Sequence, residues 1–139
     1  MKKIILNKSG FTMVELATVL VILGILSAVT IPNYMTFASK AKNASVKTNM
    51  HAIQLGVEDF ATQNEGVYPI QADEAALLAK MQDGVYPENP FTKNPTPVAW
   101  NADPANPGEI SISNLVSGGY EIKGYGKNRL LDLCLAMGQ

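Results

Sequence analysis

A stretch without charged residues, from Leu16 to Ser39, constrains this chain more than any other feature because most of it is strongly apolar. It exceeds the roughly 20 mostly apolar residues that a helix needs to span a bilayer. Glu15 stands at its entrance, and an acid at the centre of the hydrocarbon layer costs about 2.5–3.5 kcal/mol, less near the interface. This position favours a partner for the Glu15 carboxylate, the alternative being solvation by lipid headgroups.

The charges are unevenly distributed along the chain. Lys2, Lys3 and Lys8 precede Glu15, and basic residues before an apolar segment favour a cytoplasmic N-terminus with the rest translocated. The remainder is mildly acidic, so no specific nucleic-acid partner is predicted. Cys134 is the single cysteine, which excludes an intramolecular disulfide and a cysteine metal cluster. We expect it to be buried as a small apolar side chain.

Two ordinary targeting signals explain the N-terminus poorly. A secretory signal peptide is cut after its apolar region, and Glu15 would interrupt that region. An uncleaved signal anchor fits better, but it leaves the Gly10-Phe11-Thr12 junction and Glu15 unexplained.

The sequence Lys8-Ser9-Gly10-Phe11-Thr12-Met13-Val14-Glu15-Leu16, with Gly24-Ile25-Leu26 and Ile31-Pro32 after it, closely resembles the class III signal of type IV pilins and type II secretion pseudopilins. The resemblance implies that a prepilin peptidase cuts after Gly10 on the cytoplasmic side and that the new N-terminal Phe11 is N-methylated. It also implies that the apolar segment is retained. Met13, Ala17 and Thr18 depart from the commonest pattern, in which bulkier aliphatic residues are usual.

The same resemblance places the family's glutamate at Glu15 and its helix-loosening residues at Gly24 and Pro32. Cleavage would create an ammonium group at Phe11, four residues before Glu15, and opposite charges can neutralise each other where the dielectric constant is low. The pair could form within one chain or between neighbours. Between neighbours it would fix the axial register of a fibre, as a buried polar residue fixes register in a coiled coil.

A helix is predicted from about Thr12 to about Gln63. Gly24 and Pro32 lie inside it, and proline removes a backbone donor, so a kink or a locally melted stretch is expected there. The second half carries an apolar stripe with helical spacing, formed by Val46, Met50, Ile53, Val57 and Phe60. Phe37, Ala41 and Ala44 extend this stripe toward the N-terminus. This stripe predicts the core contact of a globular head, and His51 beside it is predicted to be a surface residue.

The rest of the head should be small and partly extended. The long helix should end at Asn64-Glu65-Gly66. A short helix is predicted at Asp73–Met81. A proline-rich loop is predicted at 84–97, and Phe91 and Trp100 should attach it to the core. An aromatic carbohydrate-binding platform is the alternative for that pair. Alternation predicts three antiparallel strands at 109–113, 120–125 and 131–135. The predicted fold class is α+β and pilin-like, with a long N-terminal helix, its apolar half membrane-spanning, packed by its C-terminal half on a small antiparallel meander.

These features predict three parts: a cleaved leader (1–10), a transmembrane and filament-core helix (11–40), and a globular head (41–139). We find no nucleotide-binding, hydrolase or metalloprotease motif in the sequence. Asp103, Glu109 and Asp132 are too scattered to predict a calcium site. The sequence therefore predicts neither an enzyme nor a cofactor or metal.

The predicted function is a structural pilin of a type IV pilus serving adhesion, motility or DNA uptake, in a helical homo-oligomer. The resemblance implies a membrane-held precursor, an inner-membrane assembly platform, a cytoplasmic assembly ATPase, and then a location on the cell surface or in a periplasmic pseudopilus. A major pseudopilin of a type II secretion system is the first alternative. A membrane-anchored periplasmic binding module is the alternative from another class.

Overall fold

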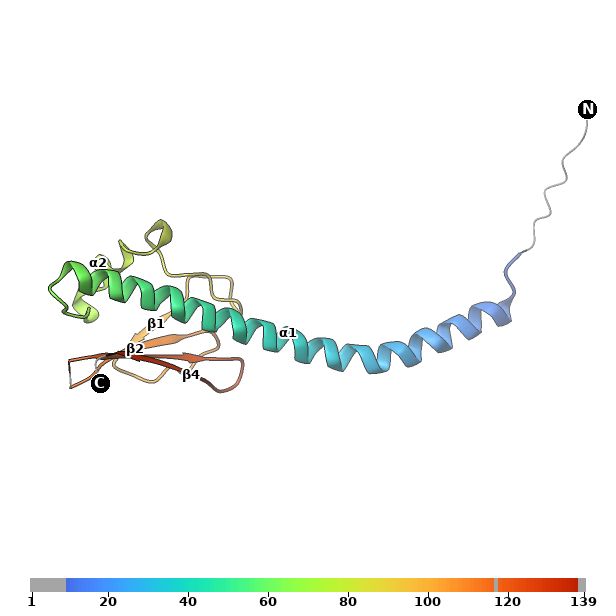
Figure 1. The fold of residues 1–139 in the computed structure, drawn as a ribbon. Coiled ribbons are helices and arrows are strands. Elements are labelled where there is room, and N and C mark those ends of the chain that lie inside the picture. The colour runs from blue at the N-terminus through green and yellow to red at the C-terminus, as the bar shows by residue number, and fades with distance from the viewer. Residues whose placement is uncertain (1–9, 117, 138–139) are drawn as a thin grey trace, which may run out of the picture. The chain divides into compact units, whose positions relative to one another are not determined.

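The computed structural model describes residues 10–116 and 118–137. The chain divides into two compact units, Met1–Phe37 and Ala38–Gln139. The elements, in chain order, are α1 (Met13–Gln63), the 3-10 turn η1 (Gln71–Asp73), α2 (Glu74–Leu78), the 3-10 turn η2 (Gln82–Gly84), β1 (Val98–Trp100), β2 (Ile110–Asn114), β3 (Tyr120–Tyr125) and β4 (Leu130–Met137) (Figure 1).

The described part of the first unit is the N-terminal part of α1 with three residues before it. Every residue from Gly10 to Phe37 is exposed. Within the described residues, α1 is the one helix long and apolar enough to cross a membrane. The helical backbone is continuous through Gly24 and Pro32, so neither residue melts it here.

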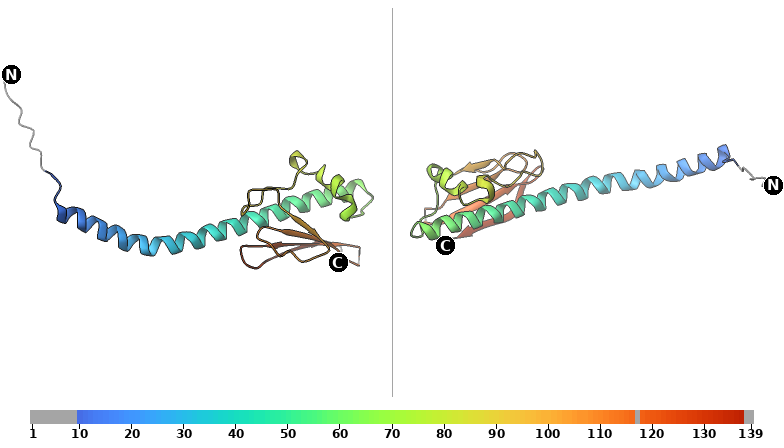
Figure 2. Two further views of the ribbon diagram at one scale, coloured as in Figure 1. Left: turned by 180° about the vertical axis from the view of Figure 1, so that it is seen from behind. Right: turned by 90° about the horizontal axis from the view of Figure 1, so that it is seen from above.

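The second unit is held together by the C-terminal part of α1 and the sheet. All five residues of the predicted stripe are buried, which confirms the core contact. They meet the inward side chains of the two central strands, which are fully buried: Ile110, Ile112, Tyr120 and Ile122. Figure 2 shows the sheet along one side of this helical segment, with the 71–97 segment on another side.

The sheet has the order β1-β2-β3-β4, and both pairs β2-β3 and β3-β4 are antiparallel. The three predicted strands lie within a few residues of β2, β3 and β4. The prediction missed β1, which pairs with β2 in parallel. The strand β1 has only three residues and follows a run of prolines, so its sequence shows no recognisable alternation. It forms because Trp100 lies opposite Ile112 and packs on the core.

Two further expectations about burial are wrong. Phe37, Ala41 and Ala44 are exposed, so the buried face of α1 begins only at Val46. Cys134 is also exposed. Its alternation partners Leu133 and Leu135 face the core, and a strand places neighbouring side chains on opposite faces, so Cys134 has to lie on the outer face.

The proline-rich segment is fastened to the head by polar contacts. Asn89 is almost fully buried, and its amide donates to the carbonyl of Pro107 (3.0 Å) while its Oδ1 accepts from the Phe91 N–H (2.8 Å). The Asn49 amide on α1 donates to the carbonyl of Glu88 (2.8 Å). Gly108 has a positive φ of 80°, and a Cβ there would lie 2.1 Å from Asn89 Oδ1, so this position requires glycine. Phe91 and Trp100 pack on the core as predicted.

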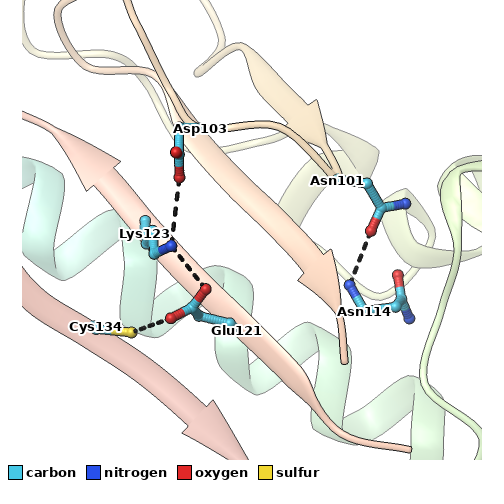
Figure 3. A network of polar contacts seen from close by, with 6 residues as sticks. All are labelled: Asn101, Asp103, Asn114, Glu121, Lys123 and Cys134. Carbon is cyan, nitrogen blue, oxygen red and sulfur yellow. Dashed lines mark hydrogen bonds and ion pairs between the residues drawn. The ribbon is translucent and has the colours of Figure 1, made fainter. Parts of the chain in front are cut away.

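A polar network crosses the outer face of the sheet (Figure 3). Lys123 Nζ lies 2.8 Å from Glu121 Oε2 and 3.3 Å from Asp103 Oδ1. Hydrogen bonds from Lys123 and Cys134 hold the pKa of the Glu121 carboxyl below its usual value. The Cys134 thiol donates to Glu121 Oε1 at 3.1 Å. Partial burial, and then this hydrogen bond, raise the pKa of Cys134, so the thiolate is disfavoured.

Replacing Ile53 tests the core. Ile53→Ala should lower the free energy of unfolding by about 2–5 kcal/mol because it leaves a cavity among fully buried side chains. Leu55→Ala is the matched control, since Leu55 lies on the same helix but is 72% exposed, and it should change that free energy by less than about 0.5 kcal/mol. Denaturant unfolding of the detergent-solubilised protein measures both values. Equal losses from the two variants would contradict the assigned core.

The thiol network predicts a slow alkylation of Cys134. At mildly alkaline pH, iodoacetamide should modify Cys134 more slowly than an unstructured cysteine, because less thiolate is present. Glu121→Gln should speed the reaction several-fold by removing the acceptor and its charge. Asp132→Asn, on the same strand, is the control and should leave the rate unchanged. Mass spectrometry follows the modification over time. If Glu121→Gln reacts at the wild-type rate, the assigned contact between Cys134 and Glu121 is refuted.

Candidate functional site

The predicted assembly residues lie at the start of α1, where the structure forms a reciprocal cap. Thr12 donates from its backbone N–H (2.8 Å) and from its hydroxyl (2.7 Å) to Glu15 Oε2. In return, the Glu15 N–H donates to Thr12 Oγ1 at 3.2 Å. The side chain of each residue thus accepts a hydrogen bond from the backbone N–H of the other. This is a capping box, in which two otherwise unsatisfied N–H groups at the helix start gain acceptors.

The cap gives the Glu15 carboxylate a role within its own chain. A negative side chain in the first turn is also stabilised by the positive end of the helix macrodipole. Both hydrogen bonds from Thr12 converge on the same carboxylate oxygen, Oε2. The carboxylate is therefore turned back toward the residues that precede the helix.

Gly10 and Phe11 precede the first helical residue, and both are exposed. Phe11 is 72% exposed. A peptide bond outside a helix has no intrahelical hydrogen bonds to break before a peptidase can bind it in extended form, so the predicted cleavage position is sterically open in the described part of the chain. The basic leader residues Lys2, Lys3 and Lys8 lie outside the described residues.

Sequence reasoning missed the role of Thr12, although a signal was present. Threonine followed by glutamate three residues later, ahead of an apolar helical run, is the sequence pattern of a capping box. The cap is compatible with the predicted neutralisation of the Phe11 amine, because a cap needs acceptor oxygens and neutralisation needs charge.

Pro32 lies inside α1 and costs the helix one backbone hydrogen bond. Proline cannot donate a hydrogen bond to the carbonyl of residue 28, and its ring crowds the preceding turn. The Asn33 side-chain amide donates to the carbonyl of Val29 at 3.1 Å. This bond gives the next carbonyl along the helix a side-chain donor, and it does not replace the bond that Pro32 cannot make to residue 28. The predicted kink at Gly24 and Pro32 stays a prediction.

The three acids considered for calcium are not brought together. Asp103 contacts Lys123, and Asp132 lies 3.9 Å from Arg129. Glu109 accepts from the N–H groups of Ala105 and Asn106, at 2.8 Å each, and so closes a local loop. Among the described residues, no group of three or more histidine, cysteine or acidic side chains is arranged to hold a metal ion.

The aromatic alternative centres on Phe91, which lines a cavity of about 750 Å³ together with Asn106, Pro107 and Lys127. Lys42 Nζ lies 5.4 Å from the centroid of the Phe91 ring, within the range of a cation–π contact. Phe91 thus has a partner from α1 as well as its core contacts. The carbohydrate-binding platform was the alternative to core packing, and nothing in the structure tests it.

Comparison with known proteins extends this description. Residues 5–31 match the family model described as the prokaryotic N-terminal methylation motif. The chain is 38% identical over 56 residues (40% of this chain) to the type IV major pilin protein of Myxococcus xanthus, and 33% identical over 97 residues (70% of this chain) to the type II secretion system core protein G of Pseudomonas aeruginosa. These matches span 26% and 61% of the two relatives' own lengths.

A longer match is found to the type II secretion system core protein G of Vibrio cholerae. The identity is 30% over 125 residues, which covers 83% of this chain and 84% of that protein. No solved structure matches the chain. The methylation motif, the extended match and the long helix packed on a small sheet agree with one another. The chain therefore belongs to the family of type IV pilins and type II secretion pseudopilins.

Proposed function

We propose that this protein is a structural subunit of a type IV-type filament, in which the apolar part of α1 packs against the same segment of neighbouring copies. The observation that carries the proposal is that every residue from 10 to 37 is exposed. An apolar helix of this kind is stable in a lipid bilayer or in a bundle of like helices, because both remove its side chains from water. The precursor would use the bilayer and the filament would use the bundle.

Glu15 would set the register of that packing. Cleavage after Gly10 leaves an ammonium group on Phe11, and an unpaired charge inside a helical bundle is costly. A neighbouring Glu15 can neutralise it at one axial position, whereas the apolar side chains alone distinguish poorly between positions. The cap at Thr12 supports this role, because it holds the carboxylate near the N-terminal end of the helix.

Between the two filament types, the extent of the matches supports a secretion pseudopilus. The match to the Myxococcus pilin covers a short part of this chain, whereas the match to the Vibrio core protein G covers most of both chains. The surface pilus predicted from the sequence is the second candidate, supported by the higher identity of the shorter match. In either case a prepilin peptidase, an inner-membrane platform and a cytoplasmic ATPase would be the partners.

Intact-mass measurement of the protein purified from membranes tests processing. We expect a mass lower by that of residues 1–10 and higher by that of one methyl substitution at Phe11, because the family motif specifies both steps. Gly10→Val is the control variant and should retain the unprocessed mass. An unprocessed wild-type protein in a host with an active peptidase would support the membrane-anchored binding module instead.

A pair of variants separates the two roles of Glu15. Glu15→Gln keeps a side-chain acceptor for the cap but removes the charge, and it should lower filament yield at least about tenfold if the amine needs a counter-charge. Thr12→Val removes the capping hydroxyl but keeps the carboxylate, and it should leave most of the yield. Filaments are quantified by immunoblotting of sheared and membrane fractions, with head stability as the folding check.

The opposite ranking would refute the registry role, because it would show that Glu15 matters only for starting the helix. The same fractions also distinguish the filament types. Abundant fibres released by shear from cells at native expression support the surface pilus, and their confinement to the cell envelope supports the pseudopilus.

A further inference from the structure

We propose that a groove on the head, between α1 and residues 80–88, binds the lysine-bearing stretch of α1 from a second copy of the chain. The stretch comprises residues 40–47, and the inference rests on the proposed filament function. It adds a directional contact between heads to the apolar packing of the helices. The two surfaces are different parts of the same chain, so the contact would be heterologous.

The groove has an apolar floor that is open to solvent. Its cavity measures about 530 Å³ and is lined on one side by α1 and on the other by the turn η2 with the residues just before and after it. Leu55 on α1 is 72% exposed and Val85 on the opposite wall is 50% exposed. Met81 also lines the groove and packs closely on Gly56 of α1. A Cβ added at Gly56 would lie 2.3 Å from the Met81 methyl group. Large exposed apolar side chains around a hollow are typical of an interaction site.

The rim of the groove is acidic. Asp59, Asp83 and Glu88 line it, against one cation, Lys80. Lys80 donates to the side-chain oxygen of Gln63, whose amide in turn lies 3.1 Å from both carboxylate oxygens of Asp59. Glu88 pairs with Lys93 at 2.9 Å, where both side chains are largely exposed. The rim therefore keeps a net negative charge after its internal contacts are counted, and it would attract a basic surface.

The lysine-bearing stretch has the complementary chemistry. Lys40 and Lys42 are exposed and Lys47 is half-buried. The exposed residues between them are small, namely Ala41, Ala44 and Ser45, so another surface can approach the helix backbone closely. Among the described residues, the ion pairs of the head include neither Lys42 nor Lys47. Lys40, Ala44 and Lys47 line one hollow at helical spacing, so this face combines positive charge with little side-chain bulk, whereas Lys42 lies over the Phe91 ring of its own head.

A second copy is the occupant because both surfaces lie on one helix and are offset along it. Ala44 and Gly56, near the centres of the two surfaces, are separated by about 18 Å at 1.5 Å per residue. A copy displaced along the helix by about that distance would bring its lysine stretch level with the groove while the helices stay parallel. A heterologous contact relates each copy to the next by a fixed rotation and shift. When repeated copies do not close into a ring, the result is an open helical assembly, as in a filament.

Thiol cross-linking tests the contact directly. In a Cys134→Ala background, Ser45→Cys marks the lysine stretch and Gln82→Cys marks the groove, and neither substitution changes a charge. A short bismaleimide applied to intact filaments should convert the double variant into a ladder of covalent oligomers. Each single variant should stay monomeric, because one thiol per chain cannot propagate a heterologous contact.

Charge reversal supplies a second measurement. Asp59→Lys with Asp83→Lys should reduce filament yield by up to about fivefold per lost pair, and adding Lys40→Glu and Lys47→Glu should restore it. Glu65→Lys is the matched control, since Glu65 is an exposed acid outside the groove, and it should assemble like wild type. Equal loss in the control, or no rescue in the combined variant, would overturn the charge pairing.

The outcomes separate this inference from the function on which it rests. If wild-type filaments form but the double-cysteine variant gives no ladder in them, the groove contact is wrong and the filament subunit stands. If the cross-linked product contains another polypeptide, the second-copy occupant is wrong. If neither filaments nor processing is found in the wild type, the proposed function itself fails.

Discussion

The head depends on a close approach between α1 and the sheet. A Cβ at Gly124 of β3 would lie 2.6 Å from the sulfur of Met50, and a Cβ at Gly126 would lie 2.8 Å from Asn43 Oδ1. These two glycines let the strand and the turn after it lie directly against the helix, and the fully buried side chains fill the remaining space. Close packing of this kind resists even small changes in side-chain volume. The position of α1 in the head is therefore fixed by packing, and the polar attachments of the 86–97 segment are built around it.

Two hydroxyl groups extend this packing into the polar surface. The Tyr120 hydroxyl donates to Glu58 on α1, and the Tyr86 hydroxyl donates to Glu74 on α2 at 3.3 Å. Burial, with the neighbouring carboxylates, raises the pKa of both tyrosines well above the usual value, so both stay protonated and remain donors over the whole physiological range. Each tyrosine thus contributes an apolar ring to the core and ties an acidic side chain to a defined place on the surface.

The sequence predicted the elements whose residues repeat with a regular period and missed features that lack one or that were inferred from average residue behaviour. Helical spacing identified the stripe from Val46 to Phe60, and alternation identified three strands, because both periods are properties of neighbouring residues. Strand β1 has no such period, and it forms because β2 offers a free edge beside the core. Cys134 was assigned from the average behaviour of cysteine, whereas its face is determined by the leucines on either side. At the candidate site, the family signal pointed to Gly10, Phe11 and Glu15, whose roles stay predictions, and the hydrogen bonds from Thr12 to Glu15 were missed although their sequence pattern is local.

In the proposed filament, Glu15 and the acidic groove would address the same physical difficulty. Apolar packing between helices is strong but nearly indifferent to sliding, because burial depends on area and not on direction. Charges correct this indifference, since a mismatched pair is left without its partner and the penalty grows where water is excluded. A single carboxylate at the start of α1 can exclude wrong registers in the apolar region, but it cannot orient a head that lies many turns further along the helix. A second set of charges on the head, offset along the same helix, would supply that orientation. Because exposed charges are screened by salt and buried ones much less so, the contact between heads should be the more salt-sensitive of the two.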